Sequence, residues 1–188
     1  QWGDANQNFE LAYGYEPKSS EAYVRYADIL KVRNPQESIR ILKLLLTENP
    51  QSALGQRELA RTYYDNNMYR DAVEQYGKYV NNPNHFDEDE AEYAFLLFWN
   101  QDYQKGYDYA TRLLAQNPDN YSAMRFQLMN AAQIPALADK MPAMALKLWT
   151  AHIADPVMRP FAPIDYNLAA DQFSKAKDYE KAEQVLTE

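Results

Sequence analysis

Small residues recur along this chain at nearly constant intervals, and the period is the strongest constraint on its fold. The intervals are 33, 34, 34, 39 and 37 residues, and the small residues are Ala5, Ser38, Ala72, Gly106, Ala145 and Ala182. Most are followed four positions later by a large apolar residue and then by a proline, as in Ala72, Tyr76 and Pro83. A period near 34 residues is typical of helix pairs stacked in a solenoid, which buries each unit against its neighbours and leaves a concave face for binding.

The hydrophobic pattern predicts first and second helices that alternate along the chain. First helices are expected at 19–32, 52–65, 87–100, 120–134 and 163–175, and complete second helices at 35–48, 69–81, 103–116 and 140–154. Start signals support these ranges: Asn34 can cap a helix with Pro35 in its first position, and Asp87 with Glu90 would form a capping box. We therefore expect an all-α chain of about eleven helices.

The phase of the period divides the chain, which we interpret as one array over residues 1–188. Residues 1–18 are expected to be the second helix of a truncated repeat, and residues 160–188 a fifth repeat that is also truncated. The four repeats between them are expected at 19–51, 52–86, 87–119 and 120–159. Both ends of the chain therefore look cut from a longer array.

The fourth repeat departs from the period. Leu128 stands where the third repeat has Ala94, and the next small residue, Ala145, comes five residues later than expected. This shift places an insertion near residues 133–142. Two interpretations stay open, a longer loop between helices or a lid or docking element over the groove.

The residues at these positions resemble the tetratricopeptide repeat (TPR) family over essentially the whole chain. The second and third repeats fit its pattern closely, through Leu59, Ala60, Tyr63, Tyr69, Ala72 and Tyr76, and then Tyr93, Ala94, Leu97, Tyr103, Gly106, Ala110, Leu113 and Pro118. The small residues let paired helices approach each other, while the large residues fill the space between pairs. The resemblance implies a right-handed solenoid of antiparallel helix pairs, with the first helices lining a concave groove.

Composition excludes several classes of function. The formal net charge of -8 disfavours nucleic acid and anionic lipid as partners, because both require clustered Lys and Arg. The chain has no cysteine for disulfides or thiol catalysis, and its longest apolar run, Tyr93 to Trp99, is far short of the roughly 20 residues that span a bilayer. No targeting segment is recognised, and the compartment stays open between the cytoplasm and an extracytoplasmic location.

Candidate catalytic groups are scarce. His85 and His152 are the only histidines and belong to no metal or nucleophile motif, so we expect His152 to be structural and His85 to be solvated. The acidic run from Asp87 to Glu92 could suggest a cation site, but its place at a helix start favours a role in capping. No glycine-rich phosphate loop occurs. The sequence therefore predicts a non-enzymatic protein without catalytic residues, cofactor or metal.

The family resemblance indicates which side of each first helix faces the groove, and this side is the predicted binding face. One end of that face is charged and the other is aromatic, and the candidate residues for binding a partner are Arg57, Arg61, Phe95, Phe98, Trp99, Arg125, Phe126 and Met129. Aromatic residues and Arg supply much of the binding energy in protein interfaces. The alternative is that these aromatic residues pack only against each other or under the inserted segment.

Three hypotheses for function follow from this pattern. The leading one is a scaffold that binds a peptide or a protein segment in its concave groove. The alternative is a structural or assembly segment, without a discrete groove ligand, that links other domains or self-associates through its truncated ends. An enzyme whose catalytic domain lies outside these residues stays a third hypothesis.

Overall fold

The computed structural model describes residues 20–187, and the chain forms two compact units, of which the first ends at Glu90 and the second begins at Ala91. Residues 20–187 form ten α-helices and two short 3₁₀ helices, without strands. The all-α prediction is confirmed for this part of the chain. The helix predicted over residues 1–18 lies outside the described residues.

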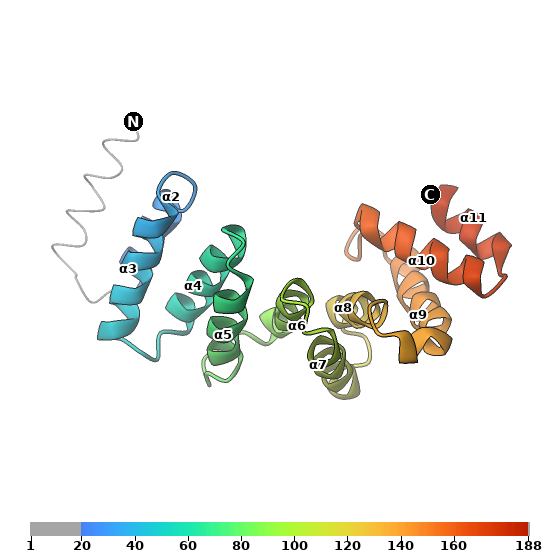
Figure 1. Cartoon of the computed structure of the whole chain (residues 1–188), viewed down its shortest axis with the longest axis horizontal. Helices are drawn as coiled ribbons and strands as arrows, with labels where there is room; N and C mark the ends of the chain where they lie inside the picture. The colour runs from blue at the N-terminus through green and yellow to red at the C-terminus, as the bar shows by residue number, and fades with distance from the viewer. Residues whose placement is uncertain (1–19, 188) are drawn as a thin grey trace. The chain divides into compact units, whose positions relative to one another are not determined.

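The first unit contains two helix pairs and a short 3₁₀ helix (Figure 1). Its elements are α2 (Ser20–Leu30), α3 (Pro35–Glu48), α4 (Ala53–Asp65), α5 (Tyr69–Val80) and η1 (Asp87–Asp89). Consecutive α-helices pack against each other. The predicted cap at α3 is confirmed, because the Asn34 side chain accepts a hydrogen bond from the Glu37 amide at 3.2 Å and Pro35 opens the helix.

The predicted capping box of Asp87 and Glu90 is wrong. Residues Asp87–Asp89 form η1, and α6 (Glu90–Trp99) begins only after it. The Asp87 side chain is 99% exposed, and no side chain caps η1. Glu90 lies instead against His85, with 3.2 Å between Oε1 and Nε2. The acidic run therefore makes specific side-chain contacts instead of the predicted cap.

The second unit continues the alternation of helices and contains the segment that was expected to be an insertion. After α6 it has α7 (Tyr103–Gln116), α8 (Tyr121–Ala131), η2 (Pro135–Lys140), α9 (Met141–Ala154), α10 (Pro163–Lys175) and α11 (Tyr179–Thr187). Helix α8 ends three residues before the predicted boundary at 134, because a turn leads directly into η2. The inserted segment is therefore a 3₁₀ helix, and it packs on α8 and α9.

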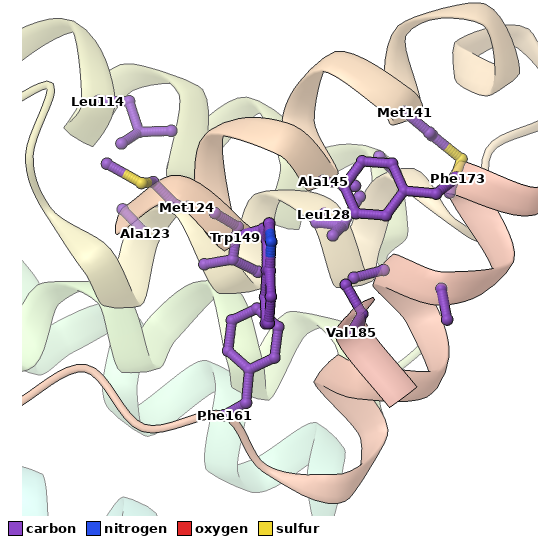
Figure 2. Packing of buried hydrophobic residues seen from close by; sticks show 14 of the residues in the cluster. Leu114, Ala123, Met124, Leu128, Met141, Ala145, Trp149, Phe161, Phe173 and Val185 are labelled. Carbon is purple, nitrogen blue, oxygen red and sulfur yellow. The ribbon is translucent and has the colours of Figure 1, made fainter. Parts of the chain in front are cut away.

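The core of the second unit shows why the period contains small residues. Ala123 and Ala145 are 0% exposed and lie among the large side chains of Leu128, Trp149 and Phe161 (Figure 2). The Trp149 and Phe161 ring centroids are 5.5 Å apart. Small residues at the crossings let the helices approach closely, and the large ones fill the remaining space.

Candidate functional site

Four aromatic side chains from α6 and α8 form one connected cluster in the second unit, which we call the aromatic face: Phe95, Phe98, Trp99 and Phe126. The ring centroids are 5.2 Å apart for Phe95 and Phe126, 6.1 Å for Phe95 and Trp99, and 5.8 Å for Phe98 and Trp99. Residues three or four positions apart share one side of a helix, so α6 presents its three aromatic rings together. Edge and tilted ring contacts of this kind are favourable.

The aromatic face lies outside the buried core. Trp99 is 40% exposed, and the other three rings are half-buried. The opposite side of α6 is buried through Leu96 and Leu97, and Ala91 and Ala94 are buried as well. Helix α6 therefore has one apolar side in the core and a second apolar side that remains partly open, which explains why it is apolar nearly all round.

Met129 does not contribute to this open surface. Its side chain is only 3% exposed, so it belongs to the interior of the second unit. Tyr103, which the sequence analysis did not select, extends the cluster instead, with its ring 5.5 Å from that of Phe98. The only signal in the sequence for this contact was the position of Tyr103, four residues after Trp99 and just past the end of α6.

A buried amide, which the sequence analysis also missed, joins the two helices that carry the aromatic face. Asn130 on α8 is 0% exposed, and its Nδ2 donates to the carbonyl oxygens of Ala94 at 3.0 Å and Phe126 at 2.8 Å. The Asn130 Oδ1 is buried without a hydrogen-bond partner among the described residues, so only the donor group of this amide is satisfied. Through the Nδ2 bond to the Ala94 carbonyl, Asn130 links α6 to α8 and helps to position the aromatic rings.

Arg125 is engaged in an ion pair within the fold. Its Nε donates to Asp165 Oδ2 on α10 at 2.6 Å, and the same carboxylate oxygen accepts from the Ala162 amide at 2.7 Å. The Asp165 side chain is 1% exposed, and the Arg125 guanidinium lies 5.6 Å from the Phe126 ring centroid. The charge of Arg125 is thus largely compensated, and the side chain links α8 to α10.

The other two candidate cations, Arg57 and Arg61, lie in the first unit and are also paired. Their terminal nitrogens contact Asp89, at 2.9 Å from Arg57 and 3.4 Å from Arg61, and both arginines also contact Glu58, at 3.0 and 3.5 Å. Two positive and two negative side chains therefore meet at this point. The eight candidate residues fall into two groups, one in each unit.

Asp89 is the centre of the network in the first unit. Tyr79 donates its hydroxyl hydrogen to Asp89 Oδ2 at 2.7 Å, and Tyr76 donates to the Asp89 carbonyl at 2.9 Å. Burial and the hydrogen bond to Asp89 raise the pKa of Tyr79 to about 12. Burial also opposes the ionisation of Asp89, but hydrogen bonds from Arg57 and Tyr79 and the nearby positive charges outweigh it and lower the pKa of Asp89.

The lowered pKa of Asp89 makes the stability of the first unit depend on acid pH. Because the pKa is lower in the folded state, the ionised form contributes stability above the ordinary aspartate pKa of about 4 and loses it as pH falls through the folded value. Asp89→Asn should therefore lower the melting temperature at neutral pH, and the difference from wild type should shrink as the pH falls below about 4. Thermal melts across this range measure it. Asp119→Asn, at an exposed position, is the control, and a constant difference for Asp89→Asn would contradict the prediction.

The two histidines have different environments. His85 was expected to be solvated, but its side chain is 18% exposed, with Nδ1 2.7 Å from the Asn82 carbonyl oxygen. That prediction is wrong, because the turn folds back on Glu90. His152 is 3% exposed and stacks on Phe161 with 4.4 Å between ring centroids, as expected for a structural residue.

Neither a metal cluster nor a membrane span occurs among residues 20–187. No group of three or more His, Cys, Asp and Glu side chains in this range could hold a metal ion. Likewise, none of its helices combines the length and the apolar character that crossing a bilayer requires.

Solved structures with similar folds are TPR proteins. A TPR protein from Parabacteroides merdae matches with a TM-score of 0.74 at 16% identity, over 99% of this chain and 71% of that one. YrrB, described as a TPR protein with an unusual peptide-binding site, matches with a TM-score of 0.68 at 15% identity, over 95% of this chain and 89% of its own. MamA from Desulfovibrio magneticus RS-1, from residue 41 to its end, matches with a TM-score of 0.70 at 16% identity, over 90% and 93%.

These likenesses show that the chain has a TPR-like fold, as its sequence pattern predicted. No protein-family model matches the sequence, and no curated protein matches it.

Proposed function

We propose that this chain is a non-enzymatic scaffold that binds a protein segment through its aromatic face. The observation that carries the proposal is that Phe95, Phe98, Trp99 and Phe126 form a connected, partly exposed surface on helices whose other sides are buried. Rigid aromatic side chains provide large contact areas at low conformational cost, and they dominate the energetics of many interfaces. The segment bound there presents apolar side chains to these rings.

Two further observations support this proposal. Asn130 holds α6 and α8 together, so the aromatic rings are positioned before a partner arrives. A protein of similar fold, YrrB, has a peptide-binding site. Arg57, Arg61 and Arg125 were also predicted to bind the partner, but each is already paired with a carboxylate. We therefore assign binding to apolar contact rather than to recognition of an acidic segment.

Replacing Trp99 and Phe126 together by Ala should abolish binding of peptides that wild type selects from a random library displayed on phage. The loss follows from removing one exposed and one half-buried ring of the aromatic face. Fluorescence anisotropy of labelled selected peptides measures it. Because Phe126 also packs against the core cluster, Trp99→Ala alone is the second variant, for which we expect at least about tenfold weaker binding.

The matched control is Val157→Ala with Met158→Ala, which removes apolar side chains that are 84% and 76% exposed elsewhere in the second unit. Circular dichroism establishes that every variant keeps its helix content. Unchanged peptide binding by folded Trp99→Ala would exclude the aromatic face as the site.

Self-association is the second candidate function, favoured by the exposure of Tyr179 and Leu186 on α11 at 65% and 62%. Light scattering over a concentration series separates the two functions. If the apparent molar mass rises with protein concentration and the chain selects no peptide, self-association is favoured.

A further inference from the structure

The inserted segment forms one wall of a cleft in the second unit. The cleft has a volume of about 650 Å³ and is bounded by the turn after α8, by η2 with the start of α9, and by α10. Its lining includes Gln133, Ile134, Asp139, Met141, Leu168 and Asp171. This volume exceeds the size of any single side chain, so the cleft can admit one from a bound segment together with water.

The inner part of the cleft is apolar. Met141 is 6% exposed and belongs to the buried cluster that also contains Phe173 (Figure 2). Ile134 and Leu168, which are half-buried, complete the apolar lining. These surfaces suit an aliphatic stem, such as the methylene groups of a long charged side chain.

The polar wall of the cleft carries more negative than positive charge. Asp139 and Asp171 line it together with one cation, Lys175, which is 2.6 Å from Asp171 Oδ2. The same oxygen accepts a hydrogen bond from Gln172 Nε2 at 2.8 Å, and the Gln172 side chain is buried. Asp139 has no ion-pair partner among residues 20–187. Asp139 therefore leaves one negative charge of the lining uncompensated.

We propose that this cleft binds an arginine or lysine side chain of the partner segment, as an anchor beside the aromatic face. The proposal rests on the proposed function. The aliphatic stem of the anchor packs against Met141 and Leu168, and its cation faces Asp139 and Asp171. The net charge of -8 on the whole chain favours a partner with positive charge.

The position of the cleft on α8 predicts the spacing of the anchor in the bound segment. Ala132, which lines the cleft, follows Phe126 by six residues along α8 and its C-terminal cap, a rise of about 9 Å. Six residues also turn the helix by about 600°, so Ala132 lies about 120° around α8 from Phe126, and an extended segment needs about three to five residues to pass between them. The basic residue should therefore stand about three to five positions from the apolar residue that contacts Phe126.

Phage selection from a random peptide library on the intact chain tests the proposal. We expect the selected peptides to carry Arg or Lys about three to five positions from an apolar residue. A selected peptide and its counterpart with citrulline in place of arginine then measure the anchor, because citrulline keeps the shape and removes the charge. Wild type should bind the citrulline peptide about fivefold more weakly, whereas Asp139→Asn with Asp171→Asn should bind both peptides equally.

Asp108→Asn with Asp119→Asn is the matched control, because it removes the same charge at exposed positions outside the cleft. This variant should keep the preference for arginine over citrulline. The proposed binding of a basic side chain in the cleft is wrong if the cleft variant also keeps that preference, or if the selected peptides show no basic position. Neither result contradicts binding to the aromatic face. If wild type selects no peptide, the proposed function fails and the anchor fails with it.

Discussion

Replacing Gly106 by Ala is expected to destabilise the second unit by about 2–3 kcal/mol, although Ala is normally the better helix former by about 1 kcal/mol. A Cβ at residue 106 would lie 2.3 Å from Oδ1 and 2.6 Å from Cγ of Asn130. Asn130 is fully buried and bonded to the Ala94 and Phe126 carbonyls, so it cannot move without losing those hydrogen bonds. The melting temperature should fall by about 5–15 °C, measured by circular dichroism.

Gly55→Ala is the matched control for this substitution. Its added Cβ would lie 2.7 Å from Leu45 Cδ2, the end of a side chain that can change rotamer, so we expect a smaller loss of stability. In a double-mutant cycle, Asn130→Ala should remove most of the additional cost of Gly106→Ala. Equal losses of stability from Gly55→Ala and Gly106→Ala would show that the Asn130 side chain can shift as easily as the end of the Leu45 side chain.

The period of small residues was sufficient to locate the helices but not the contacts that hold them. Gly106 could be identified from the sequence as a small position in a second helix. The residue that fills the space beside Gly106 could not be identified from the sequence. That residue, Asn130, is polar, and a periodic pattern treats a polar residue as exposed. Its burial depends on one carbonyl group of α6, that of Ala94, 36 residues earlier in the chain.

The ion pairs are a second feature that the periodic pattern does not predict. Arg57, Arg61 and Arg125 were selected as partner-binding residues from the pattern of single helices, which does not show what they contact across the fold. Their partners are 32, 28 and 40 residues away, close to one repeat period. Each pair therefore joins consecutive first helices or the turn leading into one. A search for opposite charges one period apart could have found Asp89 and Asp165.

The break in the period predicts an insertion near residues 133–142, but the conformation of this segment was not predictable. Pro135 opens η2 in its first turn, where its missing amide hydrogen is not needed. The same segment could equally have formed an open loop, since few local signals distinguish the two. Packing of η2 on α8 and α9 determines the outcome, and that packing depends on residues of both helices.

Arg125→Met is expected to destabilise the second unit by about 3 kcal/mol, because it leaves the Asp165 carboxylate buried with only the Ala162 amide as a partner in this network. Asp165 is 1% exposed, whereas the Arg125 side chain is 25% exposed, so we expect the lower end of the range for breaking a buried ion pair. Methionine keeps much of the apolar contact of the arginine stem. Chemical denaturation with constant m-value measures the loss.

Asp165→Asn added to Arg125→Met should restore more than half of this stability, because the buried charge is gone while the amide oxygen can still accept from Ala162. Arg40→Met is the control at an exposed ion pair with Glu37, where the arginine side chain is 61% exposed and the expected loss is below about 0.5 kcal/mol. If the double variant is no more stable than Arg125→Met alone, the loss comes from packing on Phe126 and not from the unpaired carboxylate. In that case Arg125 would belong to the aromatic face as a packing residue, and its substitution should weaken peptide binding along with Trp99→Ala.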